Sequence, residues 1–290
     1  MNFRFLLIGL LAFVISNMAY SQDDLLALLE DETPEESYEV RATFKGTRLI
    51  NGHSIETRKK NTLIFLISHR FGEINSGSYQ FFGLDQSNIR IALEYAISDR
   101  FNTGFGRNSF EKTFDGYLKY KLIGQTTSSV PVSVSLLSSA TIKTLKDNIF
   151  VEDVSTSDRM AFVHQVLVAR KFSSGFSFQL MPSYVHFNAI TLEQKRNDLF
   201  ALGAGGRIKL TQRLSLNAEY YFQINTLSRD TYNSIAIGVD IETGGHVFQL
   251  HLTNSQSMIE KGFIAETTND FFGGNIHFGF NISRAFQLGN

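Results

Sequence analysis

The stretch that decides the fold is Leu214-Ser215-Leu216-Asn217-Ala218-Glu219-Tyr220-Tyr221-Phe222-Gln223-Ile224. Every second residue from Leu214 onward is apolar, and the residues between them are mainly polar. Because successive residues of a β-strand point to opposite faces, this order predicts a strand with one apolar and one polar face. A strand of this length is long enough to cross a bilayer at a tilt.

The same two-residue period recurs from Asn61 onward. It is clear in four further stretches, which are 88–95, 200–210, 234–242 and 272–283. Less regular candidates lie at 61–71, 101–107, 112–123, 130–144, 159–172, 176–187 and 246–253. Two of these fit poorly, because 61–71 has apolar residues on both faces and 159–172 carries His164 and Gln165 on opposite sides. Together the stretches predict about twelve strands.

The connections between these strands alternate between long and short. Long segments such as 72–87 and 145–158 are followed by tight turns such as 98–100 and 173–175. Transmembrane barrels show this alternation because their tight turns face the periplasm and their larger loops face outside. We therefore predict an all-β fold, a single antiparallel transmembrane up-and-down β-barrel of about 12 strands with a short N-terminal arm.

A soluble exported β protein is the alternative, because soluble antiparallel sheets alternate as well. Three features favour the membrane. The polar faces hold many small neutral residues, as a confined lumen requires, and several candidate strands exceed the usual soluble length of about 5–6 residues. The apolar faces of the best strands carry no charge at their middle, where Arg or Lys would cost about 2–4 kcal/mol in a bilayer.

The N-terminus has the three regions of a secretory signal peptide. A basic start is followed by an apolar run from Phe5 to Val14 and by the small-residue pattern Ala19-Tyr20-Ser21. This pattern predicts a cleaved signal peptide over 1–21 and location in the bacterial outer membrane. Residues 22–60 then form an acidic N-terminal arm that is periplasmic, lumen-plugging or simply disordered, and 61–290 form the barrel.

The composition excludes several classes of function. The chain has no cysteine, so disulfides, thiol nucleophiles and Cys-ligated metals are excluded, and a net charge of −1 gives no reason to expect nucleic acid as a partner. The seven histidines are scattered, without the His-Glu-x-x-His spacing of a metal site. No Gly-x-Ser-x-Gly elbow is present. We therefore predict no enzyme activity, no catalytic residue, no cofactor and no metal, with a barrel-embedded hydrolase as a distant alternative.

Two groups of residues are candidates for function. The first consists of charged residues of both signs on the inferred inward faces, where they either line a polar passage or pair across a closed interior: Arg90, Glu94, Lys119, Lys121, Arg207, Lys209, Glu219, Asp240 and Glu242. The second lies in the long loop 75–86, which predicts a constriction or a recognition surface built on Tyr79, Phe81 and Phe82.

The first third of the mature chain resembles a known family. The residues that carry the resemblance are Phe44 to His53, Ile67 to Gly72, Phe81 to Asp85, Gly106-Arg107 and Tyr117 to Leu122. They resemble an outer-membrane β-barrel family of Bacteroidota-type bacteria known as domain of unknown function 5777. The resemblance implies a barrel in the outer membrane, and it implies no reaction and no catalytic residues.

These observations predict a porin-like protein for passive passage or uptake of a small polar solute. The alternative is a closed-lumen protein with a structural or partner-binding role. The partners expected are outer-membrane lipid, the barrel-assembly machinery and the solute itself.

Overall fold

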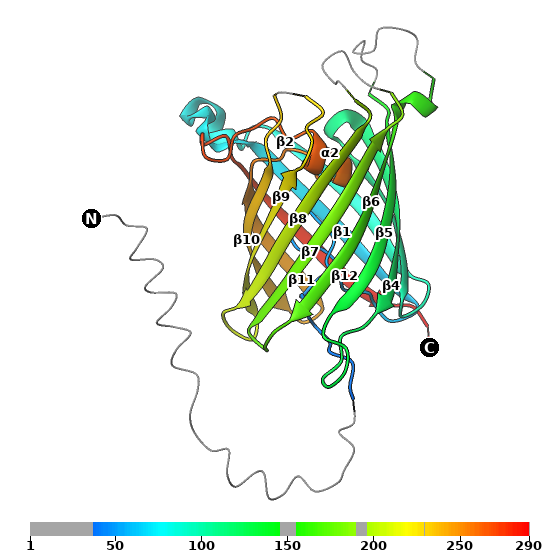
Figure 1. Ribbon diagram of the computed structural model, residues 1–290. Helices are drawn as coiled ribbons and strands as arrows, with labels where there is room; N and C mark the ends of the chain where they lie inside the picture. The colour runs from blue at the N-terminus through cyan, green and yellow to red at the C-terminus, as the bar shows by residue number, and fades with distance from the viewer. Residues whose placement is uncertain (1–36, 146–154, 190–195, 229, 290) are drawn as a thin grey trace, which may run out of the picture. The chain divides into compact units, whose positions relative to one another are not determined.

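The computed structural model describes residues 37–145, 155–189, 196–228 and 230–289. The predicted signal peptide, and the arm as far as residue 36, lie outside this range. Within it, twelve antiparallel strands form a closed barrel in which each strand pairs with the next along the chain. The first strand also pairs with the last, so the sheet has no free edge (Figure 1). The predicted all-β fold of twelve strands is confirmed.

The strands contain 8 to 12 residues, which is the range needed to cross a bilayer at a tilt. Their bounds are β1 Thr62–Glu73, β2 Ser87–Ala96, β3 Phe101–Asn108, β4 Thr113–Ile123, β5 Ser133–Lys143, β6 Met160–Lys171, β7 Phe176–Phe187, β8 Asp198–Lys209, β9 Leu214–Gln223, β10 Ser234–Thr243, β11 His246–Thr253 and β12 His277–Gln287. The short helices are η1 Ile74–Ser76, η2 Ser78–Gly83, η3 Phe110–Lys112, η4 Ser157–Arg159 and α2 Glu260–Ala265.

The last strand is the one whose predicted bounds are wrong. The sequence predicts it over 272–283, whereas β12 begins at His277 and ends at Gln287. Residues 271–274 form a turn instead, in which Gly274 has a φ of 86°. That backbone conformation suits glycine and is incompatible with a continuous strand.

The barrel has two different ends. Short connections such as 97–100 and 210–213 meet at one end, called the turn end, and the long connections meet at the other, called the loop end (Figure 1). Asn61 and Leu288 lie together at the turn end, where the Leu288 amide donates to the Asn61 carbonyl. The alternation of long and short connections in the sequence therefore corresponds to the two ends of one barrel.

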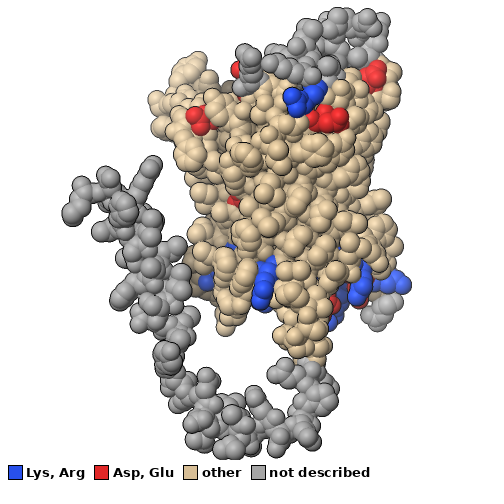
Figure 2. All heavy atoms as spheres, in the orientation of Figure 1, with Lys and Arg blue, Asp and Glu red and all other residues tan. Residues whose placement is uncertain are grey.

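On most strands the polar face points inward, as predicted. On β9, Ser215, Asn217 and Glu219 are buried, whereas Leu216, Ala218 and Tyr220 face outward and are exposed. Figure 2 shows that charged side chains on the visible outer surface gather toward the two ends and leave a band between them that is almost uncharged. Such a band matches the apolar belt by which a barrel contacts lipid.

One part of the inner wall is apolar. On β6, β7 and β8 the inward side chains include Val163, Leu167, Met181, Val185 and Leu199, all fully buried. This explains why 159–172 fits the alternation poorly, because both faces of β6 are largely apolar. An apolar inward face is stable only where something other than water covers it, and two segments inside the barrel do so here.

Candidate functional site: a filled lumen

Residues 43–56, called here the lumen hairpin, lie inside the barrel. The chain runs along the β4–β5 turn at the turn end, where Val40 donates to the Gln125 carbonyl. It then enters the lumen, reverses and returns to the turn end, where the Lys60 amide bonds Asp99. Between these points nearly every residue of the lumen hairpin is buried.

The hairpin reverses at Leu49-Ile50-Asn51-Gly52. The Leu49 amide donates to the Gly52 carbonyl at 2.8 Å, and the Ser54 amide donates to the Thr47 carbonyl at 3.0 Å. Asn followed by Gly is a preferred turn sequence, so this local fold follows from the residues present. Gly52 is also required for space, because a Cβ there would overlap the hydroxyl of Tyr221.

The tip of the hairpin binds a carboxylate on the wall. Glu219 of β9 accepts three backbone amides, from Ile50 at 3.3 Å, Asn51 at 2.8 Å and Gly52 at 3.2 Å. Successive backbone N–H groups that converge in this way form an anion-binding concavity. The wall therefore supplies the anion, and the hairpin supplies the donors.

Wall side chains bind the carbonyl groups of the hairpin as well. Lys119 Nζ donates to Glu56 O at 2.6 Å and Ser54 O at 3.2 Å. Three wall amides donate in the same way: Gln179 to His53 O at 2.8 Å, Gln249 to Leu49 O at 2.6 Å and Asn281 to Ile50 O at 2.9 Å. At the turn end, Arg207 Nη1 donates to Thr43 O at 3.1 Å.

A second segment enters the lumen from the loop end. Residues 255–267, called here the lumen loop, contain α2, and all six residues of α2 are buried. Gln223 holds the loop by donating to the Ile264 carbonyl at 2.8 Å. Lys261 anchors it with ion pairs to Glu111 at 3.0 Å and Glu266 at 2.8 Å.

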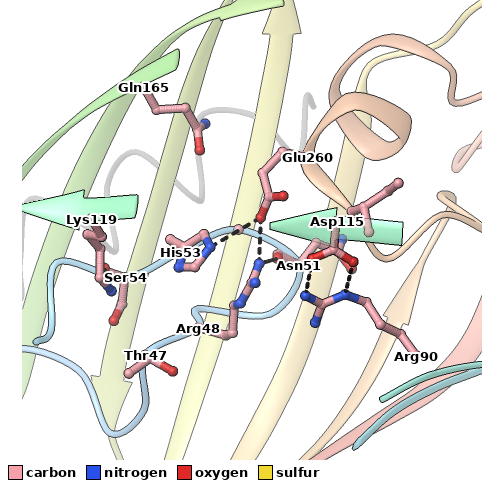
Figure 3. A network of polar contacts seen from close by, with 12 residues as sticks. Thr47, Arg48, Asn51, His53, Ser54, Arg90, Asp115, Lys119, Gln165 and Glu260 are labelled. Carbon is pink, nitrogen blue, oxygen red and sulfur yellow. Dashed lines mark hydrogen bonds and ion pairs between the residues drawn. The ribbon is translucent and has the colours of Figure 1, made fainter. Parts of the chain in front are cut away.

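The two segments meet inside the barrel. Arg48 of the hairpin donates to Glu260 of α2 at 2.6 Å, and its Nε lies 3.7 Å from Glu94 on β2. His53 Nε2 lies 3.3 Å from the same Glu260 oxygen (Figure 3). All four side chains are buried, so one polar cluster joins the hairpin, the lumen loop and the wall.

The electrostatics of this cluster fix its charge states. Burial disfavours the charged guanidinium of Arg48, but the carboxylates of Glu260 and Glu94 raise its pKa above the ordinary value. Burial would raise the pKa of Glu260, but Arg48 and His53 hold it well below the usual range. Burial and the nearby Arg48 charge lower the pKa of His53 to about 3. At neutral pH the cluster therefore contains a cation, two carboxylates and a neutral imidazole.

Apolar contacts also hold the two inserted segments against each other and against the wall. Phe44, Leu49 and Ile55 of the hairpin join one buried cluster with Phe263 and Ile264 of the lumen loop and with the apolar wall of β6, β7 and β8. The hairpin thus packs its apolar side chains against β6–β8, while its backbone groups bond polar side chains from several strands, including Gln179 of β7 and Arg207 of β8. Beside Arg48 and Arg70 a cavity of about 10 Å³ is left, which is about the space of one water molecule.

Six of the nine predicted lumen residues are buried inside the barrel: Arg90, Glu94, Lys119, Arg207, Glu219 and Asp240. Arg90 forms a two-pronged pair with Asp115, whereas Glu94, Lys119, Arg207 and Glu219 bind the hairpin. The other three, Lys121, Lys209 and Glu242, are partly exposed toward the turn end. There Glu242 pairs with Lys45, and Lys121 lies 3.6 Å from Glu39.

The predicted aromatic loop lies elsewhere. Tyr79, Phe81 and Phe82 are 95%, 59% and 53% exposed on η2 at the loop end, so they do not narrow the lumen in this conformation. The segment that enters the barrel is the lumen loop instead. The lumen loop enters because it carries four apolar side chains that are buried inside the barrel: Met258, Ile259, Phe263 and Ile264.

Arg48, Asn51, His53, Arg70 and Glu260 are site residues that the sequence does not predict. Three of them lie in the stretch 44–53 that carries the family resemblance, within the arm for which lumen plugging is one predicted alternative, but no sequence signal predicts their contacts. Among the residues that the structure describes, no group of three or more His, Asp or Glu side chains is arranged to hold a metal ion. In the same residues, no helix is long and apolar enough to cross a bilayer.

A closed twelve-stranded barrel with an apolar outer belt and a filled lumen has the architecture of a transmembrane β-barrel. The chain matches the family described as Membrane bound beta barrel domain (DUF5777) over residues 44–286, and it belongs to that family. The matched range begins in the lumen hairpin and not at β1. It confirms the predicted family and shows that the barrel is membrane-bound.

Solved structures with a similar fold include bacterial porins and channels. The COG4313 outer membrane channel from Pseudomonas putida F1 has a TM-score of 0.49 at 12% identity, with 80% of this chain and 98% of that chain covered. The NanC porin has a TM-score of 0.46 at 8% identity, with 78% and 100% covered. The KdgM porin has a TM-score of 0.45 at 6% identity, with 79% and 99% covered. No curated protein matches this sequence.

Proposed function

We propose that this protein is a porin-like channel of the outer membrane that admits small polar solutes and is closed, in the conformation described, by the lumen hairpin. In this proposal the turn end faces the periplasm, and residues 1–21 are a signal peptide cleaved after Ser21. Residues 22–60 then form an arm whose last part closes the lumen. No catalytic step is part of the proposal.

The observation that carries the proposal is how the hairpin is held. Its β-bridge between Arg48 and His53 lies within the hairpin itself, while its bonds to the barrel come from wall side chains such as Lys119, Gln249 and Glu219. Both ends of the hairpin leave at the turn end. The hairpin can therefore withdraw toward that end without breaking any strand pair, and withdrawal uncovers polar wall groups along the lumen.

Single-channel recording on the purified full chain in planar bilayers tests this proposal. We expect the unaltered protein to be mostly silent, because the hairpin fills the lumen. Gly52→Val should raise the open fraction, because its side chain overlaps Tyr221 and overpacking of this kind costs about 1–3 kcal/mol. A cost of that size changes the ratio of open to closed channels about 5- to 150-fold.

Gly46→Ala is the matched control. Gly46 lies in the same hairpin, but an added Cβ there would meet its nearest atom, Arg48 O, at 3.7 Å, which is ordinary contact. This variant should remain as silent as the unaltered protein. If Gly52→Val folds to a barrel and is also silent, the channel proposal is wrong.

The second candidate function is a closed-lumen protein with a structural or partner-binding role. The apolar wall of β6–β8 favours it, because withdrawal of the hairpin would expose Val163, Leu167 and Val185 to water. In that case the exposed aromatic side chains of η2 at the loop end would be the surface for a partner. The same recordings distinguish the two functions, since a permanent closure predicts silence from every folded hairpin variant.

A further inference from the structure

We propose that the lumen wall is a peptide-binding site, occupied in cis by residues 43–56, and that the solutes of the channel are short peptides with an apolar side chain. The part of this inference that concerns transport rests on the proposed channel function. The binding site itself does not, and it can be tested in a closed barrel as well.

The first argument is that the wall mainly recognises backbone. Five wall side chains donate to hairpin carbonyl groups, and one wall carboxylate accepts three consecutive hairpin amides: the donors are Lys119, Gln179, Arg207, Gln249 and Asn281, and the acceptor is Glu219. Main-chain groups are the same in every peptide. A wall that binds them does not require one particular sequence, which is the property expected of a peptide carrier.

The second argument is the cost of these wall groups. Lys119 is 0% exposed, and its amino group donates to the carbonyls of Ser54 and Glu56. A buried polar group of this kind is unfavourable unless it has hydrogen-bond partners. If the hairpin only filled space, an apolar wall like that of β6–β8 would be enough to hold it. The polar donors and acceptors on the wall are therefore better explained as a site that binds peptide groups.

The third argument is the pair of side-chain positions that the wall defines. Leu49 lies over Gly205 of β8, where a Cβ would come within 2.8 Å of the Leu49 methyl group. Gly52 lies against Tyr221 with no space for a side chain. The wall therefore has one apolar position and, three residues later, one position limited to glycine, and short peptides that match both should bind best.

A tethered occupant suits such a site. A short linker gives its own segment an effective concentration of about millimolar, so the hairpin keeps the site filled even if its intrinsic affinity is modest. A free peptide at comparable concentration can then compete with it. Competition of this kind would open the path only for solutes that the wall itself binds.

The experiment separates the hairpin from the barrel after folding. In the full chain, residues 57–60 are replaced by the recognition sequence of a specific protease, the protein is reconstituted in planar bilayers, and the linker is then cut. We expect conductance to appear as the freed segment dissociates. A synthetic peptide of residues 43–56 should abolish that conductance, and the same peptide with Gly52→Val should need a concentration about tenfold or more higher.

Solute class is tested on the same cut channels. The blocked tetrapeptide Leu-Ile-Asn-Gly, which copies residues 49–52, should reduce the ion current as it occupies the lumen, whereas a disaccharide of similar size should not. Equal effects of the tetrapeptide and the disaccharide would overturn the assignment of peptides as solutes. Conductance that the 43–56 peptide leaves unchanged would overturn the binding site, while the channel proposal would stand.

A silent channel after cutting would contradict the channel proposal and with it the solute assignment, but not the site. The site is then decided by fluorescence anisotropy of a labelled 43–56 peptide added to the cut barrel in detergent. Saturable binding that unlabelled 43–56 peptide displaces, and that the Gly52→Val peptide displaces only weakly, supports the site. Absence of saturable binding to a barrel that has lost its own segment overturns it.

Discussion

Arg48 joins the two segments that fill the lumen, so its removal should loosen both. Arg48→Met leaves the carboxylate of Glu260 buried without its cation, and breaking a buried ion pair in this way costs about 3–5 kcal/mol. We expect the hairpin to leave the lumen more often, measured as a higher single-channel open fraction and as faster proteolysis of residues 57–60 at the turn end.

Two further variants control this prediction. Lys45→Met removes an ion pair with Glu242, whose side chain is 46% exposed, and a pair at such a position is worth at most about 1 kcal/mol. It should change the open fraction little. Glu260→Gln added to Arg48→Met removes the unpaired charge and should recover most of the closure. Equal effects of Arg48→Met and Lys45→Met would show that Arg48 does not hold the hairpin.

His53 makes closure depend on pH. Burial and the Arg48 charge lower its pKa to about 3 in the lumen, whereas a released hairpin has a histidine of ordinary pKa near 6.5. Its contribution to closure is therefore complete above about pH 6.5 and is lost as the pH falls toward 3. Between about pH 7 and pH 5 the loss is about 2 kcal/mol.

Glu260 acts in the same direction but at lower pH. Its pKa is depressed in the lumen, so its contribution is present above its ordinary pKa of about 4.5 and decreases below that value. Between about pH 6.5 and 4.5 Glu260 therefore contributes little to the change, and the comparison with a His53 variant isolates the histidine. Recordings across this window should show opening on acidification in the unaltered protein and much less change in His53→Gln. The same pH response in both proteins would assign the effect to another group.

At the scale of elements, Lys261 decides whether the lumen loop stays in place. Burial would lower its pKa, but Glu266 and Glu111 raise it above the ordinary value, so the ammonium group is charged. In Lys261→Met, Glu111 keeps its pair with Lys143 at 2.9 Å, while Glu266 loses its pair with Lys261, which is 2.8 Å long in the unaltered protein. We expect faster proteolysis within 254–276 and an unchanged strand ladder, measured by mass spectrometry and circular dichroism. The exposed Lys112→Met should leave the cleavage rate unchanged, and equal rates in both variants would contradict this role.

The strands could be predicted from the sequence because their rule is local. On β9 and β10 the residues alternate between the lipid-facing and the lumen-facing side of the strand. The observed bounds of these two strands agree closely with the predicted bounds. On β6 the rule fails, because Val163 and Leu167 pack on the inserted segments and not on water. The apolar contact between β6 and the inserted segments thus explains both the poor alternation of the β6 sequence and the filling of the lumen.

The filled lumen could be predicted only in part. The alternative that the arm plugs the lumen could be predicted from its position in the chain next to the barrel. Its contacts could not, because they join residues far apart in sequence, such as Arg48 with Glu260 and Asn51 with Glu219. No period or spacing marks such pairs. The turn residues Asn51-Gly52 are the one local sign of a hairpin there, and Glu219 looked like any other inward charge.

At the scale of the whole molecule, the decisive property is that the outer surface contacts lipid. Ile237 lies near the middle of β10 on its outward face, and Thr243 lies on the same face at the end of the strand. An arginine costs about 2–4 kcal/mol at the bilayer midplane and about 0–1 kcal/mol near the interface. Ile237→Arg should therefore lower the free energy of unfolding in lipid vesicles by the larger amount and Thr243→Arg by the smaller, measured by urea titration. If the two variants lose the same stability, or if both unfold alike with and without lipid, the outer belt does not face a bilayer. The proposals of a channel and of a peptide site within it would then be wrong, because both require a barrel that spans the membrane.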